Sequence, residues 1–276
     1  MKTPITYYGG KQQLVSVILG MIPGHKIYCE PFFGGGAVFF AKGKSYLEVI
    51  NDKNDLLITF YKQCMSNFDE LWQRIQMTLH SESEHKKAKE IYNHPSGHSD
   101  IDIAWSLWVV TNMSIMATPR GGWKRDNGTG GSHSGVSLER HRENFTKKIR
   151  DRLQHVQISC SDALSVIRQR DTPETFFYLD PPYIGCDQKH YKGYREEDFR
   201  QLLELLTSIR GKFILSNFWS EPLKEYINHE KWNYQVIDKK CMIPALIHAP
   251  RRKQEVLVYN YDIAPSLFQN YEDTTI

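Results

Sequence analysis

An apolar run in the second half of the chain ends abruptly in Asp180-Pro181-Pro182-Tyr183, residue types that could bind an amine. The prolines fix φ and remove backbone donors, so nearby carbonyls stay available as acceptors. The Asp180 carboxylate and the Pro181 carbonyl would then meet the two hydrogens of a purine amine, and the Tyr183 ring could stack on the base. This pattern predicts an amine-binding corner at the end of a strand. A Pro-Pro turn with a capping aspartate is the structural alternative.

A glycine-rich turn, Glu30 to Ala37, follows an expected strand and opens an expected helix. Glycines there let a ligand approach the backbone, and the next helix presents free N–H groups. Asp52 lies eighteen residues after Gly34, where an acid can bind the paired hydroxyls of a ribose. The spacing indicates an adenosine-type cofactor, although Phe32-Phe-Gly-Gly-Gly36 departs from the dinucleotide fingerprint. A tight turn without a ligand is the alternative.

Basic side chains gather in one segment of the chain. Residues 118–152 contain nine Lys or Arg and four Asp or Glu, which gives 9 − 4 = +5, whereas the whole chain carries only +3. A localised basic face is expected of a phosphate-binding surface, and an ordinary solvated helix face is the alternative. Within it, segment 118–137 has no apolar periodicity and should project as a loop or hairpin. Its candidate nucleic-acid contacts are Arg120, Trp123, Lys124, Arg125, Asn127, Thr129 and Ser132, and a merely flexible loop is the alternative.

The composition narrows the function classes. Hydrophobic residues make up 40% and charged residues 24% of the 276 residues, which is typical of a soluble globular protein. The apolar stretch Ile101 to Met116 is too short to span a bilayer, so we expect a buried helix and no membrane association. Neither a secretion signal nor paired cysteines stand out, which favours a reduced cytoplasmic compartment. His94 and His98 have tolerable zinc spacing, but Pro95-Ser-Gly97 between them indicates a loop, and we expect no metal.

The elements that must position these residues alternate between strand and helix. Apolar spacing predicts helices over 11–21, 56–79, 85–92, 102–116, 139–154 and 196–209. Strands are predicted over 25–30, 48–50, 156–159, 175–179, 212–216, 234–238 and 255–261. Alternation of this kind predicts an α/β fold with a mainly parallel sheet. The last two strands lie too close for a helical crossover and should form an antiparallel hairpin.

Taken together, these motifs resemble the Dam-type DNA adenine methyltransferases over nearly the whole chain. Tyr7-Tyr-Gly-Gly-Lys11 resembles the Trp-Ala-Gly-Gly-Lys element of that family, with tyrosines in place of Trp-Ala. Glu30 to Gly36 resembles its cofactor loop, Asn51 to Leu56 its ribose-binding turn, and Asp180 to Tyr183 its catalytic tetrad. The order of the motifs also matches the class whose target-recognition domain lies between cofactor loop and tetrad.

The resemblance implies a Rossmann-like methyltransferase domain over 1–55 and 155–276. A helical target-recognition domain is implied over 56–154. The cofactor S-adenosylmethionine would contact Tyr7, Lys11, Glu30, Phe32, Gly34, Gly36, Asp52, Asp162 and Asp180. Asp162 is equally well explained as a helix N-cap. Asp180, Pro181, Pro182 and Tyr183 would be catalytic. Tyr191 and Tyr194 resemble a loop that closes over an extruded base, with surface aromatics in an ordinary loop as the alternative. Arg251-Arg-Lys253 resembles a stretch that contacts DNA, with a solvated charge run as the alternative.

The expected reaction is transfer of a methyl group to N6 of an adenine flipped out of double-stranded DNA. Two alternatives stay open on the residues alone: methylation of cytosine N4, and a DNA-binding protein on an inactive scaffold. A monomer or weak dimer on DNA is expected, in the cytoplasm of a bacterial or phage-infected cell. A cognate restriction endonuclease is a further expected partner.

Overall fold

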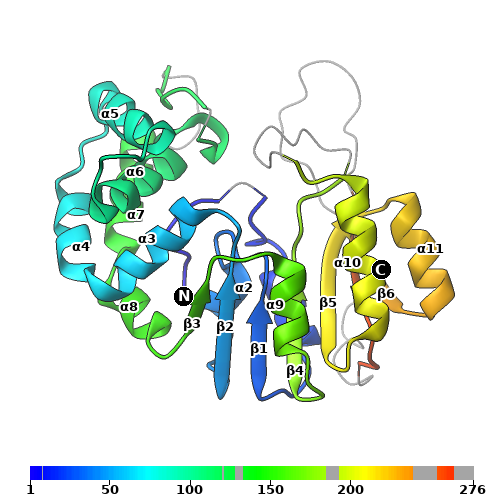
Figure 1. Cartoon of the computed structure of the whole chain (residues 1–276). Coiled ribbons are helices and arrows are strands. Elements are labelled where there is room, and N and C mark those ends of the chain that lie inside the picture. The colour runs from blue at the N-terminus through cyan, green and yellow to red at the C-terminus, as the bar shows by residue number, and fades with distance from the viewer. Residues whose placement is uncertain (8, 120, 128–132, 185–192, 239–253, 264–276) are drawn as a thin grey trace, which may run out of the picture. The chain divides into compact units, whose positions relative to one another are not determined.

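The computed structural model describes residues 1–263, except residues 8, 120, 128–132, 185–192 and 239–253. Seven strands form a sheet in the order β3-β2-β1-β4-β5-β7-β6 (Figure 1). Their bounds are β1 Ile27–Glu30, β2 Leu47–Asn51, β3 Gln157–Ser159, β4 Thr175–Leu179, β5 Lys212–Phe218, β6 Asn233–Asp238 and β7 Gln254–Tyr259. The α/β class predicted from the sequence is confirmed.

The strand directions also agree with the prediction. β2 pairs with β3, β1 with β4 and β4 with β5, all in parallel. β7 pairs antiparallel with both β5 and β6, which confirms the antiparallel pairing of the last two strands. Every position of β4 is buried, as expected for a parallel strand that is covered on both faces.

The chain divides into two compact units, residues 1–15 with 33–163 and residues 16–32 with 164–276. The first unit holds β2, β3, the short helix α2 (Ala37–Ala41) and a group of helices. These helices are α3 Asp55–Ser66, α4 Phe68–Met77, α5 Glu82–Asn93, α6 Asp100–Met113, α7 Ser134–Asn144 and α8 Lys147–Leu153. The division into catalytic and target-recognition domains stays a prediction.

Helix α6 is the centre of the helical group. It begins with a capping box, in which Ser99 and Asp102 each bond the backbone N–H of the other. α3, α4, α5 and α7 all pack against it, so its apolar residues occur around the whole circumference. Trp105 and Trp108 are fully buried there. This burial explains the long apolar stretch noted in the sequence. None of the described helices is long and apolar enough to cross a membrane.

Several helices differ from their predicted bounds. The helical spacing over 56–79 belongs to two helices, which meet at Asn67. α6 ends at Met113, and the predicted continuation to Met116 enters a 3-10 turn, Ile115–Ala117. The predicted projecting segment 118–137 is shorter at its end, because α7 begins at Ser134. The predicted helix over 139–154 is α7 followed by α8.

The second unit contains β1, β4, β5, β6 and β7 with helices α1 (Val15–Met21), α9 (Ala163–Arg170), α10 (Glu196–Ser208) and α11 (Glu221–Glu230). α10 buries one apolar face and packs against α11. Their exposed sides are joined by Arg200, which bonds Glu225, and by Tyr226, which donates to Glu204. α11 was not predicted from the sequence. It begins beside Pro222, a residue that suits the first turn of a helix.

Candidate active site

The glycine turn lies between β1 and α2 and is fastened at two points within the first unit. Gly34 and Gly36 have φ values of 49° and 65°, the left-handed region that favours glycine. The Gly34 N–H donates to Asp52 Oδ2 over 2.9 Å, and the Tyr61 hydroxyl donates to the Gly34 carbonyl over 3.0 Å. The turn is therefore held against the end of β2 and against α3.

Two aromatic rings approach these glycines closely. A Cβ atom on Gly36 would lie 2.5 Å from the Phe33 ring, and one on Gly34 would lie 3.1 Å from the Tyr7 ring. Phe33 is buried and packs edge-on against Tyr61, with ring centroids 4.8 Å apart. The glycines are thus required by local backbone conformation and by these rings. Tyr7, one of the two tyrosines that depart from the resembled family element, lies directly on the turn.

Asp52 is a half-buried acceptor at the carboxyl end of β2. Its Oδ1 accepts the Asn54 N–H over 2.9 Å, in addition to the bond that Oδ2 accepts from Gly34. Burial raises the pKa of Asp52 above its usual value, and hydrogen bonds from backbone N–H groups oppose that rise. The carboxyl group is therefore oriented by the turn before any ligand binds.

Asn51 is a site residue to which sequence reasoning gave no role of its own. Its side chain is fully buried and clamps the loop that follows β3. Oδ1 accepts from Ser159 Oγ over 2.8 Å and from the Ser161 N–H over 2.9 Å, while Nδ2 donates to the Ser161 carbonyl over 3.0 Å. Asp162 follows this clamp, is exposed, and directly precedes α9.

The remaining predicted cofactor residues are divided between the units. Lys11 belongs to the first unit, is 4% exposed, and donates from Nζ to the Gly9 carbonyl over 3.1 Å. Glu30 belongs to the second unit and is 2% exposed; its Oε2 accepts the Tyr28 hydroxyl over 2.7 Å. Phe32 is half-buried. Both charged side chains are thus oriented by neighbours in their own unit.

The tetrad begins directly after β4. The parallel register pairs Cys29 of β1 with Phe177 of β4. Glu30 and Asp180 come one and three residues after this pair, so both lie at the carboxyl ends of these neighbouring strands. Asp180 is half-buried and Pro181 is buried. Burial first, and then the charges of Asp180 and Glu30, raise the pKa of the fully buried Tyr178. This edge of the second unit is therefore acidic.

Tyr183 is held by side chains from two strands. Its hydroxyl donates to Glu255 Oε1 over 2.8 Å and lies 3.3 Å from Ser216 Oγ, which itself donates to Glu255 Oε1 over 2.5 Å. Its ring packs edge-on against Phe218, with centroids 4.5 Å apart. Burial, followed by the charges of Asp180 and Glu255, raises the pKa of Tyr183, so it stays a neutral donor.

Sequence reasoning missed Ser216 on β5 and Glu255 on β7. The sequence signal that could have found Glu255 is a carboxylate at the start of an apolar strand. The structure shows that Glu255 is fully buried. A buried carboxylate needs donors, and Tyr183 and Ser216 supply two. β5 and β7 pair antiparallel, with Ser216 opposite Leu257 and Phe218 opposite Glu255, which brings these side chains to the tetrad.

The segment after α6 folds back on itself in the first unit. Ser114 and Trp123 form an antiparallel bridge, and the Lys124 N–H donates to the Met113 carbonyl over 2.8 Å. The half-buried Trp123 ring lies 5.3 Å from that of His80. The side chains of Lys124, Arg125 and Asn127 are exposed. Arg120, Thr129, Ser132, Tyr191 and Arg251 to Lys253 lie outside the described residues.

Tyr194 lies in the second unit, shortly before α10. It is half-buried, and burial followed by the charge of Asp198 raises the pKa of its phenol. Its predicted role over an extruded base stays a prediction.

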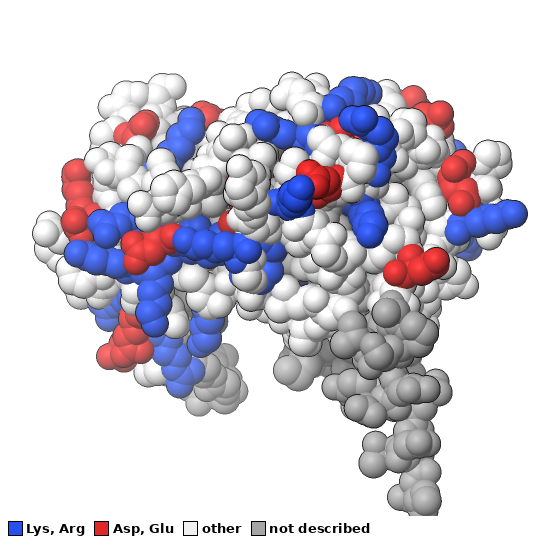
Figure 2. Space-filling view, turned by 90° about the horizontal axis from the view of Figure 1, so that it is seen from below, with Lys and Arg blue, Asp and Glu red and all other residues white. Residues whose placement is uncertain are grey.

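Not all of the basic segment is available to a ligand. The side chain of Arg152 is only 7% exposed and forms an ion pair with Glu48. Its guanidinium group also donates to the Phe39 carbonyl over 2.9 Å and lies over the Phe39 ring. Arg142 donates to the Thr78 carbonyl over 3.2 Å. On the face drawn in Figure 2, basic and acidic side chains are interspersed. Because Arg152 is buried and paired, the count of +5 over residues 118–152 exceeds the charge available at the surface.

In the described part of the chain, no group of three or more His, Cys, Asp or Glu could hold a metal ion. His94 is instead 3.8 Å from Glu90, one turn earlier on α5.

Comparison with known proteins gives one family and several relatives. The family model of D12 class N6 adenine-specific DNA methyltransferases matches residues 7–240. The type II methyltransferase M.MjaIII of Methanocaldococcus jannaschii is 26% identical, and the alignment covers 95% of this chain and 99% of that protein. The type II methyltransferase M1.LlaDCHI of Lactococcus lactis subsp. cremoris is 25% identical, with 92% and 93% covered. The modification methylase LlaI of Lactococcus lactis subsp. lactis is 23% identical over 95% of this chain, which spans only 44% of that relative's length.

Proposed function

Because the chain belongs to the D12 class of N6 adenine-specific DNA methyltransferases, we propose that it methylates N6 of an adenine rotated out of double-stranded DNA. The observation that carries the proposal is the tetrad Asp180 to Tyr183, which follows a fully buried parallel strand. Ligands of α/β sheets bind at this end of the strands. The family match favours adenine over cytosine as the target base.

Asp180 and Pro181 activate the amine. The lone pair of an adenine amine is delocalised into the ring, which makes the nitrogen a poor nucleophile. Two N–H hydrogen bonds, to the Asp180 carboxylate and the Pro181 carbonyl, favour a pyramidal nitrogen with an available lone pair. The carboxylate also offsets the positive charge that develops on the nitrogen. Positioning and electrostatics therefore supply the catalysis, without a covalent enzyme intermediate.

Tyr183 stacks on the extruded base and recovers part of the cost of extrusion, which is a few kcal/mol. A ring that stacks on a base positions the base best when the ring itself is held rigidly. The hydroxyl bonds to Glu255 and Ser216 and the edge-on contact with Phe218 restrain its ring. Ser216 and Glu255 are therefore positioning residues, which act through Tyr183.

The first unit carries groups that fit S-adenosylmethionine, which supplies an electrophilic methyl group when bound. The glycine turn presents left-handed backbone beside a half-buried carboxyl group, that of Asp52, which suits ribose hydroxyls. Lys11 offers a buried ammonium group that suits the carboxylate of the methionine end. Tyr7, Gly34 and Gly36 of the same unit suit further contacts with the cofactor, and the family resemblance also assigns cofactor contacts to Glu30, Phe32 and Asp180. Asp162 suits the adenine end.

A direct test combines methyl transfer with binding. Asp180→Ala should abolish transfer of a labelled methyl group from S-adenosylmethionine to DNA, while DNA affinity changes little. The exposed Asp151 on α8 offers a matched control, because Asp151→Ala should leave both unchanged. Methyl transfer retained by Asp180→Ala would refute the role given to that carboxylate.

The proposal also includes a cellular setting. The relatives are named modification methylases or type II methyltransferases, which supports a role beside a cognate restriction endonuclease. The protein acts on cytoplasmic DNA as a monomer or weak dimer. Residues 56–154 serve as its target-recognition domain. Sequencing that detects modified bases in DNA from expressing cells would report both the base and its context.

A further inference from the structure

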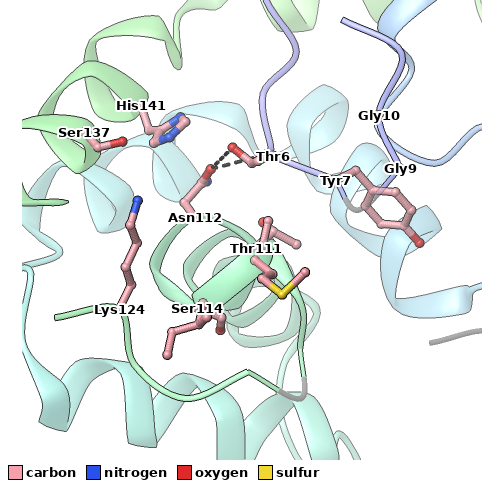
Figure 3. A pocket seen from close by; sticks show the side chains of 13 residues that line it. Thr6, Tyr7, Gly9, Gly10, Thr111, Asn112, Ser114, Lys124, Ser137 and His141 are labelled. Atoms are coloured by element: carbon pink, nitrogen blue, oxygen red, sulfur yellow. Dashed lines mark hydrogen bonds between the residues drawn. The ribbon is translucent and has the colours of Figure 1, made fainter. Parts of the chain in front are cut away.

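A pocket of about 520 Å³ lies within the first unit, where the amino-terminal segment, α6, the 3-10 turn and α7 meet (Figure 3). Its lining includes Lys124, Ser137 and His141, and none of the thirteen lining residues is acidic. Figure 3 shows the Lys124 side chain extended toward Ser137 and His141. Cationic and hydroxyl donors without an acidic neighbour are the chemistry of an anion site.

The charges around His141 point the same way. Desolvation first, and then the positive charges of Lys124 and Lys2, lower the pKa of His141 below its usual value. Lys2 belongs to the amino-terminal segment, and Lys124 belongs to the segment after the 3-10 turn Ile115–Ala117. α6 contributes no charged side chain to the lining of the pocket. In the described part of the chain, no carboxylate forms an ion pair with Lys2 or Lys124. Three basic groups thus share one region with no acid among them.

Neighbouring acids are engaged elsewhere. Asp126, two residues after Lys124, accepts the Ser134 N–H and the Ser134 hydroxyl, each over 2.7 Å. The last carbonyls of α6 favour positive charge, which could explain one cation, Lys124, beside the carboxyl end of this helix. The same effect does not explain the presence of His141 and Lys2. Met116 and Ala117, also in the lining, have positive φ values of 59° and 54°, a strained backbone that often marks a functional site.

We propose that this pocket binds one backbone phosphate of DNA, held by Lys124, His141 and Ser137. The inference rests on the proposed function, since it names a contact of the same DNA substrate. Lysine and hydroxyl contacts to phosphate carry no sequence information, so the pocket sets the position of the duplex and not the choice of site. Protonated His141 adds a second positive charge, so binding takes up a proton, and affinity rises as the pH falls from 8 toward 6.

The salt dependence of duplex binding by the full chain tests the proposal. Fluorescence anisotropy at several KCl concentrations gives the log–log slope, at pH 8 and at pH 6. Lys124→Ala should make the slope shallower by about 0.9 at both pH values, the loss of one phosphate contact. His141→Gln should match wild type at pH 8 and be shallower at pH 6. Lys224→Ala and His229→Gln on α11 are matched controls and should behave as wild type.

The outcomes separate the two proposals. A chain that binds neither DNA nor S-adenosylmethionine would refute the proposed function itself. DNA binding with slopes unchanged in both pocket variants would overturn the phosphate site alone. Inorganic phosphate, added at constant ionic strength, tests the source of the anion. Pocket variants that lose affinity for inorganic phosphate but bind DNA as wild type would assign the pocket to a small anion, and would also overturn the proposal.

Discussion

At the scale of the residue, the hydroxyl of Tyr183 has a structural task that its ring does not share. Tyr183→Phe keeps the ring but removes one of the two hydroxyl donors to the buried Glu255. We expect the free energy of unfolding to fall by about 1–3 kcal/mol, the cost of a lost bond to a buried polar group. Methyl transfer should fall less than in Tyr183→Ala, which also loses the stacking surface. Urea unfolding and kcat measurements check both. Tyr46→Phe is the control, because Tyr46 is 93% exposed.

Gly36 leads to a second prediction at this scale. A Cβ atom would face both a φ of 65° and the Phe33 ring at 2.5 Å. Gly36→Ala should therefore destabilise the fold by more than the 1–2 kcal/mol that left-handed backbone alone costs, and weaken S-adenosylmethionine binding. Gly20 in α1 has open space and no positive φ, so Gly20→Ala should be neutral or stabilising by about 0.5–1 kcal/mol. Equal effects of the two changes would contradict the importance of the turn. Thermal unfolding and ligand titration measure both.

The tetrad and the glycine turn could be found in the sequence because each is a contiguous string of unusual residues. Their supports could not. Glu255 is 72 residues from Tyr183, and Ser216 is 33 residues away. A single sequence carries no sign that such distant positions meet. The role of Asn51 was hidden for the same reason, because its partners in the loop after β3 lie about 110 residues later.

At the scale of the element, a buried ion pair fastens α8 to β2 and α2. Arg152 on α8 bonds Glu48 on β2, and Lys42, after α2, donates to the same carboxylate over 2.5 Å. Burial opposes ionisation of Glu48, but the hydrogen bonds from Arg152 and Lys42 outweigh it and lower the pKa. Removing one partner of such a pair leaves a buried charge uncompensated.

Arg152→Ala should therefore lower the free energy of unfolding by about 3–5 kcal/mol. Arg150→Ala, which affects a partly exposed arginine beside Asp151, should change it by less than about 1 kcal/mol. The Glu48 contribution depends on pH. Since its folded pKa is lowered, the stabilisation is present above the unfolded value of 4.5 and is lost as the pH falls through the folded value. Urea unfolding between pH 7 and pH 3 should show less acid sensitivity in Glu48→Gln; an identical pH profile would contradict this.

Element ends show where sequence patterns stop being informative. The strands were located to within about two residues, because apolar runs bounded by turn residues are a direct signal. The start of α7 was missed. Its first residue, Ser134, is capped by Asp126 eight positions earlier, whereas a cap is usually sought at the preceding residue. The charge of Arg152 was assigned to the surface because counting charges does not distinguish a buried cation from an exposed one.

At the scale of the whole molecule, ligand binding should be visible as added stability. A ligand that binds only the folded state at a hundred times its Kd adds about 2.7 kcal/mol. At about 2–4 °C per kcal/mol for a chain of this size, that corresponds to a rise in Tm of roughly 5–11 °C. S-adenosylmethionine should raise the Tm of the wild type. At the same ligand concentration, Asp52→Ala should show a smaller rise, and an equal rise would exclude Asp52 from the site.

The position of β7 has a consequence for biosynthesis. This strand, residues Gln254–Tyr259, pairs with β5 on one side and with β6 on the other, although both precede it in the chain. During translation, β6 therefore stays without its sheet partner until residues 254–259 have been synthesised and have left the ribosome. Glu255, which restrains Tyr183, arrives with the same strand. A nascent chain that stalls before this point would carry every residue of the tetrad and still lack the support that holds its tyrosine.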